Sequence, residues 1–197
     1  YARALRALGD QPHQVACEVH LGLARIHYQW DDLGVTATHA EKSSRMATLL
    51  ECDSALGADA LRAQILMSRG ETDAALALLS HASTAAQTRN EQGGRRCIAE
   101  AQVQALIQTG EIIAAGQIAQ SEALPLAHAR VLLARGQALQ AHEALTEFLE
   151  TSRGGTSTTD ILRALLLDAL ALDAFDPSDA ALMVLEEVLT LAEPQGC

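Results

Sequence analysis

"MSRGETDAALALL" (residues 67–79) places a short polar joint with a central glycine between two stretches rich in Ala and Leu. Both flanking stretches repeat apolar residues at helical spacing, so the segment predicts a helix, a tight turn and a second helix. The same arrangement returns at four other places in the chain, the last of them a fainter copy. These are "IQTGEIIAAGQIA" (107–119), "LARGQALQAHEAL" (133–145), "DAFDPSDAALMVL" (173–185) and "YQWDDLGVTATHA" (28–40).

The joints recur at a regular distance. Those at Asp31, Gly70, Gly110 and Asp176 are spaced at roughly 40 residues, a period that signals a solenoid of helical pairs. Gly136 marks one further joint at a shorter interval. A glycine after a first helix adopts the left-handed conformation that ends the helix. The chain is therefore predicted to be one repeat domain over residues 1–197, an α-solenoid of about five helical hairpins with a concave groove.

Composition supports an all-α fold. The chain of 197 residues is 49% hydrophobic but only 3% aromatic, so its core depends on Leu, Ala, Ile and Val. Ala and Leu are strong helix formers, and the β-branched runs typical of strands are missing. We expect helices at about 2–8, 13–29, 32–50, 56–69, 72–90, 95–109, 111–121, 124–135, 138–152, 158–174 and 178–193. Residues 89–96 and 152–159 are expected to be loops.

Small side chains are expected to let the helices approach closely. Each helical pair alone leaves one apolar face uncovered, and the neighbouring pair buries it. On the first helices these side chains are Ala24, Ala63, Ala129 and Ala169, and on the second helices Ala75, Ala115, Ala141 and Ala181.

Charge and motifs exclude several classes of function. The net charge of −11 and the scattered arginines argue against contact with nucleic acid. Lys42 is the only lysine, and it stands without the glycines of a phosphate-binding loop. Metalloprotease and serine-hydrolase motifs are missing as well. We therefore expect no enzyme activity and no cofactor in these residues, and dispersed cysteines favour a reduced, cytoplasmic protein.

The repeats resemble the tetratricopeptide sensor region of MalT-type regulators, which are ATP-dependent bacterial transcription activators of the LuxR class. The resemblance covers essentially the whole chain. It rests on "EVHLGLARIHYQWDDL" (18–33), "ILMSRGETDAALALL" (65–79), "HARVLLARGQALQAHEALTEFLETS" (128–152) and the ending "ALLLDALALDAFDPSDAALMVLEEVLTLAEPQGC" (164–197).

The resemblance implies the larger context of the chain. Members of the family carry a nucleotide-binding module before the repeats and a helix-turn-helix after them. Nucleotide and DNA binding are therefore expected only in such flanking domains. The chain also begins in what looks like mid-helix, with "YARALRALGD", and we expect it to be a fragment of a longer protein.

The concave face is the candidate binding surface, because first helices line the groove of a helical-pair solenoid. Amide groups among apolar walls can fix the orientation of a ligand, although polar residues in a groove are also ordinary where it is only wet. The candidate residues are Arg25, Tyr28, Gln64, Met67, Glu100, Gln104, Gln108, Arg130 and Arg163.

Two smaller clusters have competing interpretations. His13, Cys17, His20 and His27 recur along one side of the expected helix 13–29, and such residues can hold zinc. The favoured interpretation is that His20 and His27 line the core, so no metal site is predicted. Trp30 beside Tyr28 could stack on a flat ligand, but the favoured interpretation is that Trp30 fills the turn.

Two functions fit these features. The first is a sensor domain that binds a small-molecule inducer or a regulatory protein on its concave face and so controls activator assembly. The second is a generic tetratricopeptide scaffold for protein–protein contacts, with no small ligand and with self-association possible. No membrane-spanning or signal segment is evident in the sequence.

Overall fold

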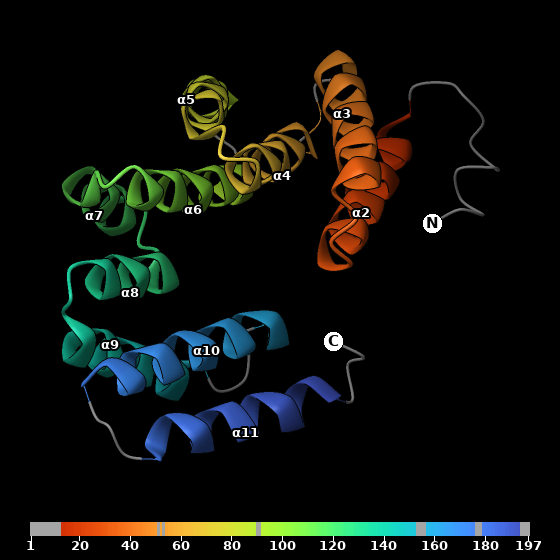
Figure 1. Cartoon of the computed structure of the whole chain (residues 1–197). Coiled ribbons are helices and arrows are strands. Elements are labelled where there is room, and N and C mark those ends of the chain that lie inside the picture. Colours follow the sequence, from red (N-terminus) through yellow and green to blue (C-terminus); the bar gives the residue numbers. More distant parts are fainter. Residues whose placement is uncertain are drawn as a thin grey trace. The chain divides into compact units, whose positions relative to one another are not determined.

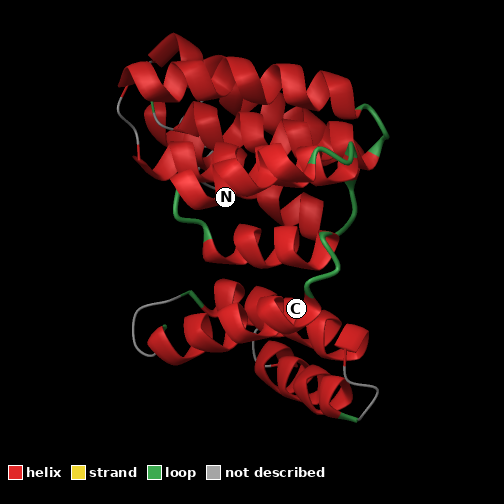
Figure 2. Cartoon of the chain, turned by 90° about the vertical axis from the view of Figure 1, so that its left-hand side faces the viewer, coloured by secondary structure: helices red, strands yellow, loops and turns green. Residues whose placement is uncertain are grey.

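The computed structural model describes residues 13–50, 52, 54–89, 92–152, 157–175 and 179–193. Within these ranges every regular element is a helix, and short loops join them (Figure 2). The all-α repeat architecture is therefore confirmed. The expected helix at 2–8, the joint at Asp176 and much of the expected loop 152–159 lie outside the described residues.

The helices, labelled in Figure 1, group into two compact units that are divided between Thr109 and Gly110. The prediction of one domain over the whole chain stays a prediction. The first unit contains α2 (Gln14–Gln29), α3 (Leu33–Leu50), α4 (Ser54–Ser68), α5 (Thr72–Arg89) and α6 (Gln92–Gln108). The second contains α7 (Ile112–Ser121), α8 (Pro125–Ala134), α9 (Ala138–Thr151), α10 (Thr158–Phe175) and α11 (Ala180–Ala192).

One packing rule recurs in both units. Helices pair into the hairpins α2–α3, α4–α5, α8–α9 and α10–α11, and the first helix of a later hairpin packs on both helices of the preceding one. In this way α4 contacts α2 and α3, α6 contacts α4 and α5, and α10 contacts α8 and α9. None of the helices in the described ranges is long and apolar enough to cross a membrane.

The predicted small residues lie at these contacts. All eight alanines are buried, and six of them are fully inaccessible to solvent: Ala24, Ala63, Ala75, Ala115, Ala129 and Ala141. In the first unit, Ala63 and Ala75 belong to one core with Leu79 of α5 and Ile98 of α6. The prediction that alanines permit the close approach of helices is confirmed.

The joints close as the sequence indicates. Gly70, Gly110 and Gly136 have φ of 78°, 82° and 73°, and Asp31 has φ of 58°. These left-handed residues follow the ends of α4, α6, α8 and α2, respectively. Ala123, between α7 and α8, also has a positive φ of 50°, which its sequence did not indicate.

The prediction of a loop at residues 89–96 is wrong for residues 92–96, because α6 begins at Gln92. The paired glycines suggested a flexible joint, but Gly94 lies inside the helix. A Cβ added at Gly94 would stand 2.9 Å from Leu56 Cβ of α4 and closer still to Leu56 Cδ1. Gly94 therefore permits the contact between α4 and α6 rather than a turn.

Alanine at the joint glycines should destabilise the protein through the backbone alone. A Cβ at Gly70 would meet no atom within 4 Å, so the cost of Gly70→Ala is the left-handed strain of about 1–2 kcal/mol. The measurement is the free energy of unfolding in urea. Gly34→Ala in α3 is the matched control, because its nearest atom would be Asp32 Oδ1 at 3.9 Å and its φ is not positive, so it should be neutral or stabilising. Equal stability of Gly70→Ala and the wild type would contradict the assignment.

Candidate functional site

The nine predicted binding residues are divided between the two units. Seven lie on α2, α4 and α6, while Arg130 lies on α8 and Arg163 on α10. Their use as one binding surface stays a prediction. Arg25, Gln108 and Arg163 are exposed, Tyr28, Gln64, Glu100, Gln104 and Arg130 are half-buried, and Met67 is buried.

Met67 is wrong as a surface residue. It is 5% exposed and belongs to the core shared by α4, α5 and α6. The physical reason is its register, because Met67 continues the buried stripe of Ala60 and Ala63 at a spacing of three and four residues. Its side chain therefore faces the core and not solvent.

Three other predicted residues have structural neighbours that the sequence did not show. Arg25 of α2 lies over Gly57 of α4, with Nη2 3.4 Å from the position of an added Cβ there. Tyr28 packs against the small cluster that Ala24 forms with residues of α3 and α4. Arg163 Nη1 lies 3.8 Å from Asp160 Oδ1 within the same helix, and an exposed pair of this kind contributes little stability.

Trp30 does not fill the turn between α2 and α3, so that interpretation is wrong. The side chain is 71% exposed and contacts the ring of His27 edge-on at a centroid distance of 5.4 Å. Backbone hydrogen bonds close the turn without a side chain inside it. Asp31 N donates to Tyr28 O, and Asp32 N donates to His27 O. Trp30 is thus free to contact another molecule.

The four residues considered as zinc ligands have different surroundings, although the rings of His20 and His27 both lie near that of His39, at centroid distances of 4.9 and 6.0 Å. His13 Nδ1 accepts a hydrogen bond from Val15 N, and Cys17 Sγ lies 3.7 Å from Cys52 Sγ in a buried contact. Burial and the Cys52 side chain raise the pKa of Cys17 to about 11, so its thiol stays protonated. Within the described ranges, no group of three or more His, Cys, Asp or Glu side chains could hold a metal ion.

His20 does line the core, paired with His39 of α3. The two Nδ1 atoms lie 2.7 Å apart, so one ring donates a hydrogen bond and the other must accept it in its neutral form. Burial lowers the pKa of both imidazoles; for His20 the neighbouring His39 and Lys42 add to the effect, and for His39 Lys42 and His27 do. This pair links α2 to α3 only while at least one ring is uncharged.

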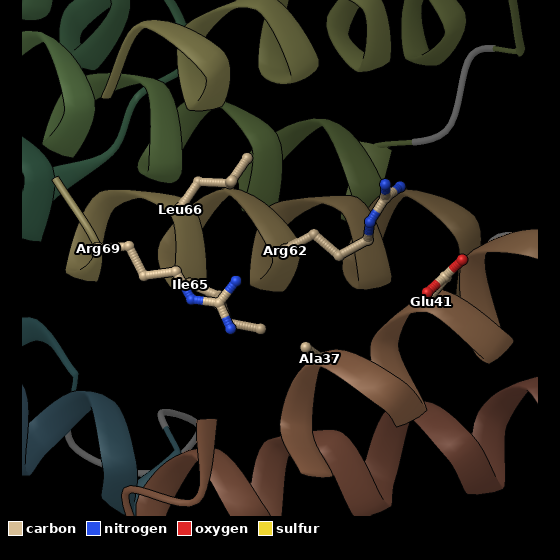
Figure 3. A pocket seen from close by; sticks show the side chains of 6 residues that line it. All are labelled: Ala37, Glu41, Arg62, Ile65, Leu66 and Arg69. Atoms are coloured by element: carbon tan, nitrogen blue, oxygen red, sulfur yellow. The ribbon is translucent and has the colours of Figure 1, made fainter. Parts of the chain in front are cut away.

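A surface depression lies between α3 and α4, within the first unit. It has a volume of about 140 Å³ and is lined by Ala37 and Glu41 of α3 and by Arg62, Ile65, Leu66 and Arg69 of α4. The α4 residues follow one another at spacings of three, one and three, so they share one helix face. Ile65 and Leu66 make its floor apolar, and charged groups border it (Figure 3).

The two arginines of this depression differ in their surroundings. Arg62 Nη1 lies 3.0 Å from Asp59 Oδ1, which also accepts a hydrogen bond from Ser44 Oγ. Arg69 is exposed, and in Figure 3 its guanidinium reaches into the space between α4 and Ala37. No carboxylate of the described residues pairs with the guanidinium of Arg69. Arg62 is therefore held in place, whereas Arg69 is available to an incoming acidic group.

This depression was not predicted from the sequence. None of its six lining residues is among the nine predicted ones. The sequence does contain part of this pattern. Arg62 and Arg69 are seven residues apart, with Ile65 and Leu66 between them, which places all four on one helix face. The sequence could not show that Ala37 and Glu41 face them, because α3 and α4 belong to consecutive hairpins.

Comparisons with known proteins bear on the family and the fold. The family model described as MalT-like TPR region, where TPR is the tetratricopeptide repeat, matches residues 1–197. Two crystal structures of the nearly identical TPR-like repeats of a Podosopora anserina kinesin light chain are similar in fold. One of them is 19% identical over 94% of this chain and 99% of that chain, with a TM-score of 0.59. The other is 19% identical over 93% and 98%, with a TM-score of 0.58. No curated protein matches the chain.

Lowering the pH should reduce the stability of the folded protein, because His20 and His39 then take up protons. Because the folded-state pKa values of His20 and His39 lie below the ordinary value of 6.5, the unfolded state binds protons more readily. Their contribution to stability is present above about pH 6.5 and is lost as the pH falls from there through the folded-state pKa values. Melting curves between pH 7.5 and 5.5 should show a falling Tm.

His39→Gln should flatten this dependence of Tm on pH. His81→Gln is the control, because His81 is exposed on α5 and should leave the slope unchanged. The same slope in the wild type and in His39→Gln would show that the pair does not titrate with unfolding.

Proposed function

Because the chain belongs to the MalT-like TPR region family, we propose that it is the non-catalytic regulatory domain of a MalT-type transcription activator of the LuxR class. In this role it binds a segment of a regulatory protein and so controls assembly of the activator. The domain needs no cofactor, acts in the bacterial cytoplasm, and leaves nucleotide and DNA binding to flanking domains. The observation that carries the binding mode is the α3–α4 depression with its charged border.

The size of the depression favours a protein segment over a small-molecule inducer. Small-molecule sites enclose roughly 300–1,000 Å³. The depression measures about 140 Å³, which suits one or two side chains of a docked segment. Its apolar floor accepts an aliphatic group, and Arg69 offers a cation to a neighbouring carboxylate. The proposed ligand is therefore a segment that presents an apolar side chain next to an acidic one.

Binding in the α3–α4 depression can change the angle between two consecutive hairpins. The depression is formed by the second helix of one hairpin and the first helix of the next. A segment that contacts both helices prefers the angle between hairpins that fits it best. A ligand shifts a conformational equilibrium only by its difference in affinity for the two states, and this position supplies such a difference.

Reversing the charge of Arg69 tests the proposal. In the complete activator, Arg69→Glu should reduce the regulatory response in a reporter assay by at least about tenfold, because a hydrogen bond to a charged group contributes about 2 kcal/mol. The fold should be preserved, since Arg69 is exposed. Arg96→Glu is the matched control on α6, exposed in the same unit and away from the depression, and should respond as the wild type does.

Two results would contradict the proposal. One is a reading frame around this chain that encodes no nucleotide-binding module and no helix-turn-helix, which would favour the generic scaffold. The other is a metabolite that raises the Tm equally in the wild type and in Arg69→Glu, which would place a small-molecule site elsewhere.

A further inference from the structure

Cys17 and Cys52 lie against each other in the core of the first unit, although 35 positions separate them in the sequence. Both are free thiols, and their Sγ atoms are 3.7 Å apart. Cys17 is fully buried, and Cys52 is 5% exposed. Neither thiol lines the α3–α4 depression, so the proposed function gives this pair no role.

The pair lies where three helices meet. It forms a small cluster with Ala47, in the last turn of α3, and Ala55, in the first turn of α4. Cys17 is in the first turn of α2, and Cys52 lies in the connection between α3 and α4. A covalent bond between the two thiols would therefore join the start of the first hairpin to the start of the second.

Backbone hydrogen bonds hold Cys52 in this place. Cys52 N donates to Ala47 O over 2.9 Å, and Ala55 N donates to Cys52 O over 3.3 Å. The first bond ties the connection to the end of α3, and the second ties it to the start of α4. Cys17 N donates to His13 O over 3.2 Å at the start of α2. The contact between the two sulfur atoms is therefore a property of the folded unit.

A disulfide bond would require only a small displacement of the two sulfur atoms. An S–S bond is about 2.0 Å long, so the distance of 3.7 Å would shorten by about 1.7 Å. Rotation of a cysteine side chain about its Cα–Cβ bond moves the sulfur atom while the backbone stays in place. Cys52 has the greater freedom to adjust, because it lies in a connection and Cys17 lies within a helix.

The surroundings of the two thiols indicate which one reacts first with an oxidant. Burial, followed by the neighbouring Cys52, raises the pKa of Cys17 to about 11, so this residue has little of the thiolate that attacks an oxidant. Cys17 is also inaccessible to solvent, whereas Cys52 is slightly accessible. The first step therefore falls to Cys52. Because even Cys52 is nearly covered, the pair responds to sustained oxidation and not to brief exposure.

We propose that Cys17 and Cys52 form a reversible disulfide bond when the protein is exposed to a peroxide. The sulfur of Cys52 attacks one peroxide oxygen, the O–O bond breaks, and Cys52 becomes a sulfenic acid while its proton leaves with the other oxygen as water. The sulfur of Cys17 then attacks the sulfenic sulfur, the S–O bond breaks, and the released hydroxide takes up the Cys17 proton as a second water molecule. The two sulfur atoms are oxidised and the peroxide oxygens are reduced. A dithiol reductant reverses the bond by thiol–disulfide exchange.

The bond would restrain the first two hairpins relative to each other. A disulfide stabilises a protein mainly by restricting its unfolded chain, and the effect grows with the length of the closed loop. Here the loop spans 35 positions and contains α3 with most of α2. Disulfides in cytoplasmic proteins are usually transient and often sense the redox state. The inference does not rest on the proposed function, because the bond needs only the folded first unit.

A variant that keeps only this pair of cysteines tests the inference. Cys97→Ala with Cys197→Ala leaves Cys17 and Cys52 as the only thiols. After treatment with excess hydrogen peroxide, the folded variant should lose both titratable thiols and the mass of two hydrogen atoms, and it should stay a single chain on a non-reducing gel. Its Tm should rise by at least about 5 °C, because the closed loop is long, and should return to its starting value after dithiothreitol.

The matched control keeps two thiols in the same unit. Cys52→Ala with Cys197→Ala leaves Cys17 and Cys97, which pack in different core clusters. Peroxide should form no bond within this chain and should cause no rise in Tm that dithiothreitol reverses. In the unaltered protein, peptide mapping after the same treatment should identify the bond between Cys17 and Cys52. This measurement decides the question if a variant fails to fold.

Three outcomes would overturn the inference. The first is a folded protein that keeps both thiols after prolonged exposure to peroxide. The second is a bond that lowers the Tm or that forms only in urea, because the folded unit would then not accommodate it. The third is a bond between two chains in place of one within the chain.

Discussion

The packing of a first helix on both helices of the preceding hairpin is the contact on which the rest of this structure depends. Gly94 against Leu56 is its tightest example, because any side chain at Gly94 would collide with Leu56. Fully buried alanines such as Ala24, Ala63 and Ala129 serve the same purpose at the other contacts. A chain with few aromatic residues gains its dispersion energy from many close aliphatic contacts, and these require small residues between the helices.

This contact also determines where surfaces for other molecules can form. The α3–α4 depression lies between consecutive hairpins, so its walls are placed by the same packing that buries the alanines. The depression is thus a consequence of how consecutive hairpins stack.

The helical hairpins could be predicted from the sequence. The contacts between one hairpin and the next could not. Gly70 and Gly136 predict both the turns and the pairing of the helices they join, because a residue that adopts the left-handed conformation can be recognised locally. Gly94 looked like a joint because the sequence cannot distinguish a glycine that turns the chain from one that admits a neighbouring side chain. Met67 was misplaced because a small error in helix phase moves a side chain from solvent to core. The α3–α4 depression needs the offset between two helices of different hairpins, which no local pattern contains.

A double-mutant cycle between Leu56 and Gly94 tests this packing most directly, with unfolding free energies as the measurement. Gly94→Ala should cost about 1–3 kcal/mol in the wild type, because the added methyl group overpacks the contact. In the Leu56→Ala background, which itself costs about 2–5 kcal/mol, the methyl group enters vacated space. There Gly94→Ala should become neutral or stabilising, since Ala favours a helix over Gly by about 1 kcal/mol. The same cost of Gly94→Ala in both backgrounds would contradict the account.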